Sequence, residues 1–229
     1  MRWRGSNPEV ATTPHATLRA RLEEIQANTR KYVPAEKLAI TERAIEELRR
    51  SGLAERALAV GARAPEFELA DGNGKVFRSA DALSRGRLVV SFYRGRWCPY
   101  CVAELEFLQA VLPQIQAAGA SLVAISPQTA KHSYFTADQH QLHFPVLSDP
   151  GNRVARQFGL AYRLPQELEQ LYRSIFINLP NSNGDQSWEL PLPATYILER
   201  DGTVLCAFAD PDHMRRAEPA ELLERLRIP

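Results

Sequence analysis

The segment RLVVSFYRGRWCPYC, residues 87 to 101, runs from a buried strand into a helix and carries two cysteines at the junction. Its first half, RLVVSFY, is a continuous apolar and β-branched run, which is typical of a strand buried on both faces. A helical pattern begins at Cys98, because the apolar residues that follow it share one face. Cys98 would then lie at the carboxyl end of a central strand, where open α/β sheets place their ligands.

The segments on either side predict an α/β fold. FELADGNGKVF indicates a hairpin, and both ASLVAIS and FPVLSD indicate buried strands that are followed by helices. PATYILERDGTVLCAF predicts a second hairpin with Asp201-Gly202 as its turn, and EPAELLERLR predicts a closing helix. In the helix that begins at Cys98, we expect Pro113 to introduce a kink. The order predicts a mixed central sheet flanked by helices, with an antiparallel pair on its C-terminal side.

The chain divides into three parts by pattern. Residues 1–15 are polar and aperiodic, which predicts a flexible tail. Residues 16–59 carry two helical patterns and predict a helical N-terminal extension, and residues 60–229 form the α/β domain with an insertion around 175–191. The apolar stripe of the extension must cover either the chain's own body or a second copy, so a homodimer is one expectation.

Composition excludes several classes of protein. The 229 residues carry a net charge of +1, without the clustered basic excess that nucleic-acid binding needs. No apolar run approaches the ~20 residues of a membrane span, and the N-terminus does not have the pattern of a secretory signal. Three cysteines are too few for a disulfide-stapled secreted domain. We therefore expect a cytoplasmic protein with no nucleic-acid or membrane partner.

The CPYC segment has the features of a reactive dithiol. A thiolate at Cys98 would meet unpaired backbone N–H groups and the positive end of the helix dipole. Arg94 and Arg96 would add positive charge if their side chains turn inward. Pro99 suits the first helical turn. Cys101 lies three residues on, on nearly the same helix face, so Cys98 is predicted to attack and Cys101 to resolve the product as an intramolecular disulfide.

The cysteines have two other interpretations. A zinc site needs four ligands, and neither a second CxxC nor a His pair at metal spacing is present, so a metal role for the CxxC is disfavoured. Inert structural thiols are disfavoured by the helix-start position. Val204, Cys206 and Phe208 alternate along one strand, which predicts a packed core thiol at Cys206 rather than a second resolving thiol. Trp97 either shields the nucleophile, presents a partner-binding surface or simply packs.

The motifs FYRGRWCPYC, AISPQT, FPVLSD, LPLPATYILERDG and DPDHMRRAEP, in this order, resemble the peroxiredoxin-like branch of the alkyl hydroperoxide reductase and thiol-specific antioxidant family. The resemblance runs from about Val60 to the C-terminus. It implies a thioredoxin fold and reduction of hydroperoxides by a peroxidatic cysteine. It also implies recycling by a thioredoxin- or glutaredoxin-type reductant without a metal or organic cofactor.

The sequence departs from the family pattern near the dithiol. Gly95 stands where peroxiredoxins carry a Thr or Ser hydroxyl, and Ser91 stands where they carry a proline. Pro193 replaces the arginine that normally precedes the PATYIL strand. A proline there resembles the cis-proline that faces the CxxC of thioredoxins, so Pro193 is a candidate cis residue, with an ordinary trans proline at a strand start as the alternative. Arg94 or Arg96 would then have to stabilise the leaving oxygen.

Three functions follow from these residues. The first is a thiol peroxidase in which Cys98 forms a sulfenic acid that Cys101 resolves. The second is a thiol-disulfide oxidoreductase in which Cys98 attacks a protein or small-molecule disulfide. The third is a non-catalytic metal-carrying or interaction module. His213, Arg215 and Arg216 lie on an Asp/Pro-rich turn and are expected to be solvated, although a histidine there could carry protons.

Overall fold

The computed structural model describes residues 17–227. Its centre is a five-stranded sheet in which β3 pairs in parallel with β4 and β4 with β5. On the other side of β3, β8 pairs antiparallel with β3, and β9 pairs antiparallel with β8. The strands are β3 (Leu88–Phe92), β4 (Ser121–Ser126), β5 (Val146–Ser148), β8 (Ala194–Leu198) and β9 (Val204–Ala209). The mixed sheet and its antiparallel C-terminal pair are confirmed.

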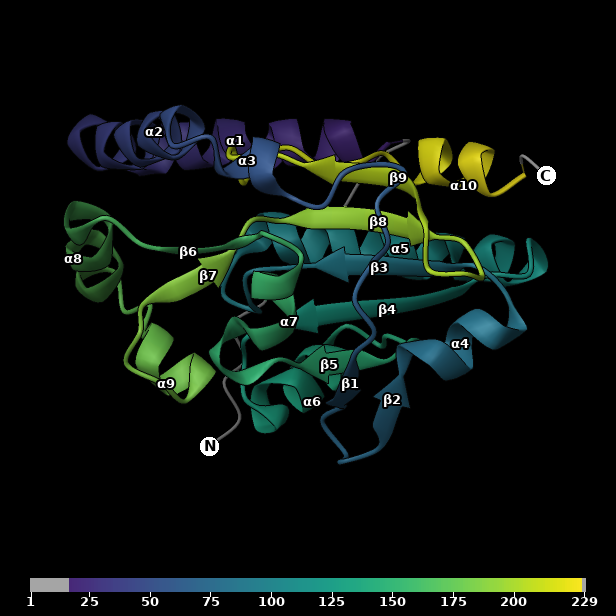
Figure 1. Ribbon diagram of the computed structural model, residues 1–229. Coiled ribbons are helices and arrows are strands. Elements are labelled where there is room, and N and C mark those ends of the chain that lie inside the picture. The colour runs from purple at the N-terminus through teal and green to yellow at the C-terminus, as the bar shows by residue number, and fades with distance from the viewer. Residues whose placement is uncertain (1–16, 228–229) are drawn as a thin grey trace.

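Two short antiparallel sheets of two strands each flank this sheet, and only the first of them is a hairpin. The first was predicted, and the second pairs a strand that the sequence did not indicate with the end of the insertion. They consist of β1 (Glu68–Ala70) with β2 (Val76–Arg78), and of β6 (Ala161–Arg163) with β7 (Glu189–Pro191). Figure 1 shows that β3 and β4 point their carboxyl ends toward the end of the molecule that holds β6, β7 and α8 (Gln166–Ser174).

Helices cover both faces of the sheet. One core packs β3 and β4 against α1 (Leu18–Tyr32), α5 (Pro99–Ala117) and α10 (Pro219–Arg227), with α6 (Ala130–Gln139) at its side. The other core lies on the opposite face and includes α4 (Ser79–Arg85) and α7 (Arg153–Gln157). Alternate residues of β3 enter the two cores: Val89 enters the first, and its neighbours Leu88 and Val90 enter the second.

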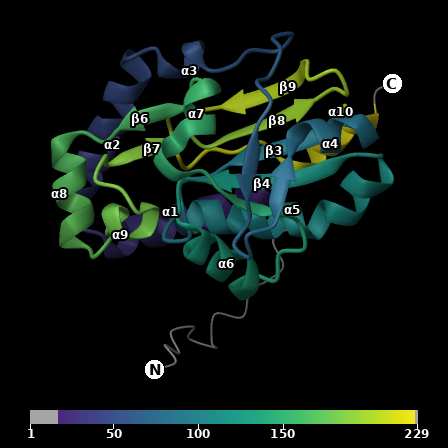
Figure 2. The same ribbon diagram turned by 60° about the horizontal axis from the view of Figure 1, so that its bottom comes forward.

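The N-terminal helices pack on the chain's own body. The helix α1 lies on α5, with Leu18 and Leu22 buried, whereas α2 (Ala35–Arg50) lies on α8, as Figures 1 and 2 show. A short helix α3 (Leu53–Arg56) follows, and Gly52 before it has a left-handed φ of 67°, which suits glycine. The apolar stripe is therefore covered by the chain's own body. A homodimer stays a prediction, but the need to cover this stripe no longer supports it. The predicted tail, residues 1–15, lies outside the described residues.

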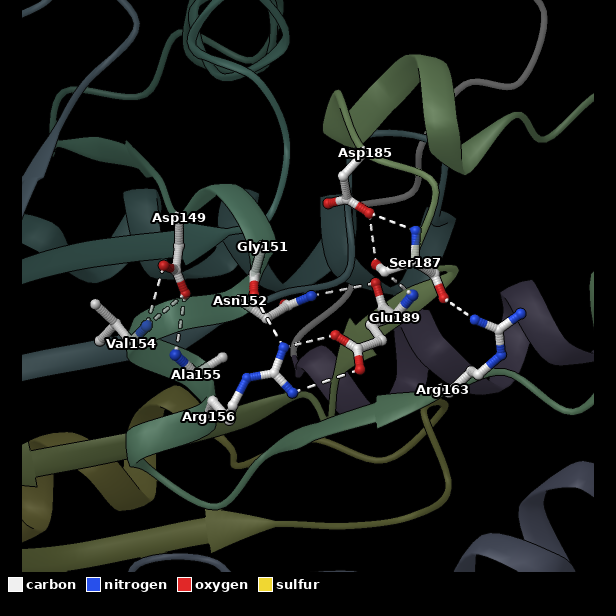
Figure 3. A network of polar contacts seen from close by, with 10 residues as sticks. All are labelled: Asp149, Gly151, Asn152, Val154, Ala155, Arg156, Arg163, Asp185, Ser187 and Glu189. Atoms are coloured by element: carbon white, nitrogen blue, oxygen red, sulfur yellow. Dashed lines mark hydrogen bonds and ion pairs between the residues drawn. The ribbon is translucent and has the colours of Figure 1, made fainter.

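Side-chain contacts tie the insertion to the body. Arg156 of α7 forms an ion pair with Glu189 of β7 at 2.7 Å, and Arg163 of β6 donates to the Ser187 carbonyl at 2.7 Å (Figure 3). Asp149 accepts hydrogen bonds from backbone N–H groups of the first turn of α7. The predicted insertion thus contains a short helix, α9 (Leu179–Asn183), and a strand that is firmly paired.

The helix α5 continues through Pro113 to Ala117, so the predicted kink lies within one continuous helix and stays a prediction. One prediction about β9 differs from the structure. Val204 and Cys206 do not share a face, because the pairing of β8 with β9 shifts by one residue between Ile197 and Leu198. This irregularity sends Val204 into one core and the half-buried Cys206 against the other.

Across residues 17–227, every helix is either too short or too polar to cross a membrane.

Candidate active site

Cys98 occupies the N-cap position of α5, directly after the loop that leaves β3, with Pro99 in the first turn. Both placements agree with the sequence-based predictions. The side chain is buried, with only 2% of its surface exposed, and Cys101 below it is fully buried. The first turn of a helix has backbone N–H groups without intrahelical partners, and together with the helix dipole they favour an anion at this position.

The two thiols have opposite ionisation preferences. Burial raises the pKa of Cys98, but a hydrogen bond from Cys101 and the charges of Arg94 and Arg216 outweigh it and lower the pKa to about 6. Burial raises the pKa of Cys101 well above its usual value, and the hydrogen bond to Cys98 and the charge of Cys98 add to this effect. Near neutral pH the pair therefore holds one thiolate, at Cys98, and one thiol, at Cys101.

Arg94 is the cation that turns inward. Its side chain is 1% exposed, and its Nη2 donates a hydrogen bond to the hydroxyl of Tyr172 on α8. The guanidinium lies 4.9 Å from the ring centre of Trp97, and Trp97 in turn contacts Tyr172 edge to face at 5.4 Å. Two aromatic rings thus fix the guanidinium, while its Nε has no hydrogen-bond partner among the described residues. Trp97 is a packing residue that holds this cation.

A second buried cation lies beneath Cys101. Arg216 forms an ion pair with Glu104 at 2.5 Å and donates to the Cys101 sulfur at 3.3 Å. Thr195 of β8 donates to the other oxygen of Glu104 at 3.1 Å. Burial raises the pKa of Glu104, and the charge of Arg216 acts in the opposite direction. The expectation that Arg216 is solvated was wrong, whereas Arg215 is exposed and pairs with Asp210 at 3.0 Å.

The loop between Arg94 and Cys98 leaves no room for a side chain at Gly95. A Cβ there would lie 2.5 Å from Trp97 Nε1 and 2.7 Å from Gln128 Oε1, and the φ of Gly95 is 153°. Gln128 accepts a hydrogen bond from the Arg96 backbone at 2.5 Å, which anchors the loop to the end of β4. The Arg96 side chain is exposed and donates to Gln139 at 2.9 Å, so it does not turn inward.

Pro193 is buried directly before β8, and its expected cis bond is absent, since every peptide bond of residues 17–227 is trans. The alternative, an ordinary proline at a strand start, is the one that the structure has.

His213 is only partly exposed, so the expectation of a solvated ring was wrong. Its ring contacts Tyr100 of the CPYC segment edge to face at 5.7 Å. Burial and the charges of Arg94 and Arg216 lower its pKa well below the usual value, so the ring is neutral at pH 7. Among the residues that the sequence did not single out, Glu104 carried a signal: it follows Cys101 by three positions on the apolar face of α5, where a charged residue is unusual. No feature of the sequence around Tyr172 indicated that it belongs to the site.

The lowered pKa predicts how Cys98 reacts with an alkylating agent. With a pKa of about 6, about nine-tenths of Cys98 is thiolate at pH 7. In a Cys206→Ser background, the rate of alkylation by iodoacetamide should be level above pH 7. Because only the thiolate attacks, the rate should fall roughly tenfold per pH unit below pH 6. A midpoint near 8.5, the value of a free thiol, would show that the two arginines do not stabilise the thiolate.

The described residues contain no group of three or more His, Cys, Asp and Glu side chains that could hold a metal ion. What the arrangement offers is thiol chemistry. It places a nucleophilic thiolate at a helix start, a second thiol in hydrogen-bond contact, and two buried cations that stabilise negative charge.

Comparison with known proteins agrees with this chemistry. The model of the AhpC/TSA family matches residues 60–206. The thiol-disulfide oxidoreductase ResA of Geobacillus thermodenitrificans is 26% identical over 149 residues, which are 65% of this chain and 68% of that protein. The crystal structure of peroxidoxin BcpB from Mycobacterium tuberculosis superposes with a TM-score of 0.59 at 24% identity, covering 74% of this chain and 97% of that one.

The structure of peroxiredoxin Q from Xanthomonas campestris superposes with a TM-score of 0.52 at 21% identity, covering 70% and 89% of the two chains. These two structures support the predicted fold, and the family match identifies the chemistry as thiol redox chemistry. The chain therefore belongs to the AhpC/TSA family and is a thiol-dependent oxidoreductase with a thioredoxin-type fold.

Proposed function

We propose that the protein is a thiol peroxidase in which Cys98 reduces hydroperoxides and Cys101 resolves the product. The observation that carries this proposal is the burial of Arg94 next to the Cys98 thiolate, with an Nε that has no partner among the described residues. A donor held in place by Trp97 and Tyr172 can bind the oxygen on which negative charge develops. Arg94 thereby takes the role of the hydroxyl that Gly95 cannot supply.

Reduction of the hydroperoxide takes two steps, oxidation of Cys98 and its resolution by Cys101. The Cys98 thiolate attacks the outer oxygen of the hydroperoxide, the S–O bond forms and the O–O bond breaks, and the alkoxide leaves as an alcohol after it takes up a proton. The Cys101 thiol then attacks the sulfur of the sulfenic acid and releases water, which leaves a Cys98–Cys101 disulfide. A dithiol reductant of the thioredoxin or glutaredoxin type returns both cysteines to thiols by disulfide exchange. Neither step uses a metal or an organic cofactor.

A thiol-disulfide oxidoreductase is the second candidate, and the similarity to ResA favours it. A protein disulfide, however, must bring its sulfur to within bonding distance of Cys98, and that side chain is 2% exposed. A small hydroperoxide needs far less access than a folded partner. Burial of the nucleophile therefore favours the peroxidase. We further propose a cytoplasmic location, where a thioredoxin-type reductant keeps the dithiol reduced.

Trapping of the sulfenic acid tests the proposal. A Cys101→Ser/Cys206→Ser protein is mixed with one equivalent of hydroperoxide and then with dimedone, and the adduct is located by mass spectrometry. The peroxidase predicts one dimedone adduct, on Cys98, in most of the protein. A disulfide oxidoreductase predicts no adduct with peroxide but a stable mixed disulfide on Cys98 with a small disulfide. That second pattern would contradict the peroxidase.

A further inference from the structure

A cavity of about 290 Å³ lies between the N-terminal extension and the site. One wall is the helix α2, which contributes Thr41, Ala44, Ile45 and Leu48, and the opposite wall includes Tyr162 of β6. Figures 1 and 2 show α2, β6 and α8 together at one end of the molecule. A larger cavity of about 530 Å³ exists elsewhere, but it is lined by none of the residues of the site.

The cavity ends at the residues that surround the dithiol. Arg94 and His213 both line it. Arg94 carries the charge that stabilises the Cys98 thiolate, and the His213 ring packs on Tyr100, two residues from Cys98. The inner end is therefore polar and cationic. The outer rim is exposed and carries charges of both signs, at Glu47, Arg56 and Arg163.

The walls between these two ends are largely apolar. The residues that line them include Ala44, Ile45, Leu48, Leu53 and Leu168. A cavity near the ~300 Å³ lower limit of ligand pockets is far too large for hydrogen peroxide, which is only about twice the size of a water molecule. An apolar wall also gains nothing from hydrogen peroxide, whereas it stabilises an apolar body by roughly 25 cal/mol per Å² of buried surface.

We propose that this cavity is the substrate pocket and that the face of α2 formed by Thr41, Ala44, Ile45 and Leu48 makes the protein selective for organic hydroperoxides with an apolar body. The body lies against α2, and the peroxy group reaches past Arg94 to Cys98. The inference rests on the proposed peroxidase function and adds to it a specificity-determining element. That element lies outside residues 60–206, the part that matches the family model.

Kinetics with two peroxides test this proposal. For the wild-type protein we expect kcat/KM for cumene hydroperoxide to exceed that for hydrogen peroxide by about tenfold or more. Leu48→Trp fills the cavity from the α2 side and should lower the ratio of the two kcat/KM values about tenfold. Thr41→Phe fills it from about two turns earlier on α2 and keeps the test available if the first variant does not fold. Glu42→Trp adds the same ring on the exposed face of α2 and should leave the ratio unchanged.

The outcomes separate the two proposals. If the wild-type protein reacts with neither peroxide faster than free cysteine does, the proposed function itself is wrong. If it reacts rapidly with both, and neither filling variant changes the ratio, the peroxidase stands and the α2 pocket is wrong. An independent measurement is inhibition by 2-phenyl-2-propanol, the alcohol product, during turnover of hydrogen peroxide. It should inhibit the wild-type and Glu42→Trp proteins but not Leu48→Trp, and equal inhibition of all three would contradict the pocket.

Discussion

Replacing Cys98 with serine is expected to lower the rate of hydroperoxide consumption by at least about a thousandfold. A serine hydroxyl at the start of α5 stays protonated at neutral pH, so the stabilisation that Arg94 and Arg216 give to the thiolate has no anion to act on. The measurement is peroxide consumption in the presence of excess dithiothreitol. Burial is the largest cause of the raised pKa of Cys101 and remains when Cys98 is replaced, so Cys101 is not expected to take over the role of the nucleophile.

Two other cysteine variants complete this experiment. Cys206→Ser should keep the wild-type rate, because Cys206 lies half-buried on β9 and is not part of the dithiol at the start of α5. Cys101→Ser should consume about one equivalent of peroxide per chain in the absence of added thiol and then stop. Full activity of the Cys98→Ser protein would overturn the assignment of the nucleophile, and loss of activity in Cys206→Ser would implicate a third thiol.

Breaking the buried ion pair under the dithiol should have the largest effect on stability. In Glu104→Leu the Arg216 guanidinium stays buried without its carboxylate partner, which costs about 3–5 kcal/mol of the free energy of unfolding. Arg216→Met should cost a similar amount, because it leaves the Glu104 carboxylate unpaired. It should also raise the pKa of Cys98, since one of the two stabilising charges is lost. Urea unfolding and the pH dependence of alkylation measure these two effects.

The matched controls are a double variant and a surface pair. Glu104→Leu/Arg216→Met removes both charges, and such replacements are often neutral or stabilising, so it should be more stable than either single variant. Arg43→Met breaks the exposed ion pair with Glu167 and should cost no more than about 1 kcal/mol. If the two single variants at Glu104 and Arg216 also cost no more than about 1 kcal/mol, the pair does not hold the site together.

Most of the scaffold could be predicted from the sequence, because the pattern of apolar residues along each main strand and helix is clear. The continuous apolar runs of β3 and β4 and the glycine turn of the last hairpin each specify one element. The strand β6 was missed because it has three residues, AYR, and owes its existence to pairing with β7 rather than to a pattern of its own.

Only the part of the site formed by residues close together in the sequence could be predicted. Cys98, Pro99 and Cys101 lie on one helix start, so their arrangement follows from spacing alone. Arg94 and Arg96 looked equivalent, and the difference between them comes from Tyr172, which lies 78 positions after Arg94. The same holds for Arg216, whose partner Glu104 is 112 positions away. Contacts between residues so far apart in the sequence depend on the fold, and no local sequence pattern predicts them.

Burial of charge explains why these arginines matter. An arginine at the surface contributes little to the ionisation of a thiol, because water screens its charge. Arg94 and Arg216 are both buried, and their charges act on Cys98 through protein rather than through water. The turn that carries His213 and Arg216 therefore belongs to the site, although its composition is that of a solvated loop.

The rate at which the reduced protein reacts with a hydroperoxide tests the central claim most directly. Stopped-flow fluorescence at pH 7, with Trp97 as the reporter beside the dithiol, should follow the oxidation of Cys98 under second-order conditions. The proposed peroxidase predicts a rate constant at least about a hundredfold above that of free cysteine thiolate, which is what one preorganised donor contributes. A rate constant no higher than that of free cysteine, together with rapid reaction toward a small disulfide, would contradict the peroxidase and favour the disulfide oxidoreductase.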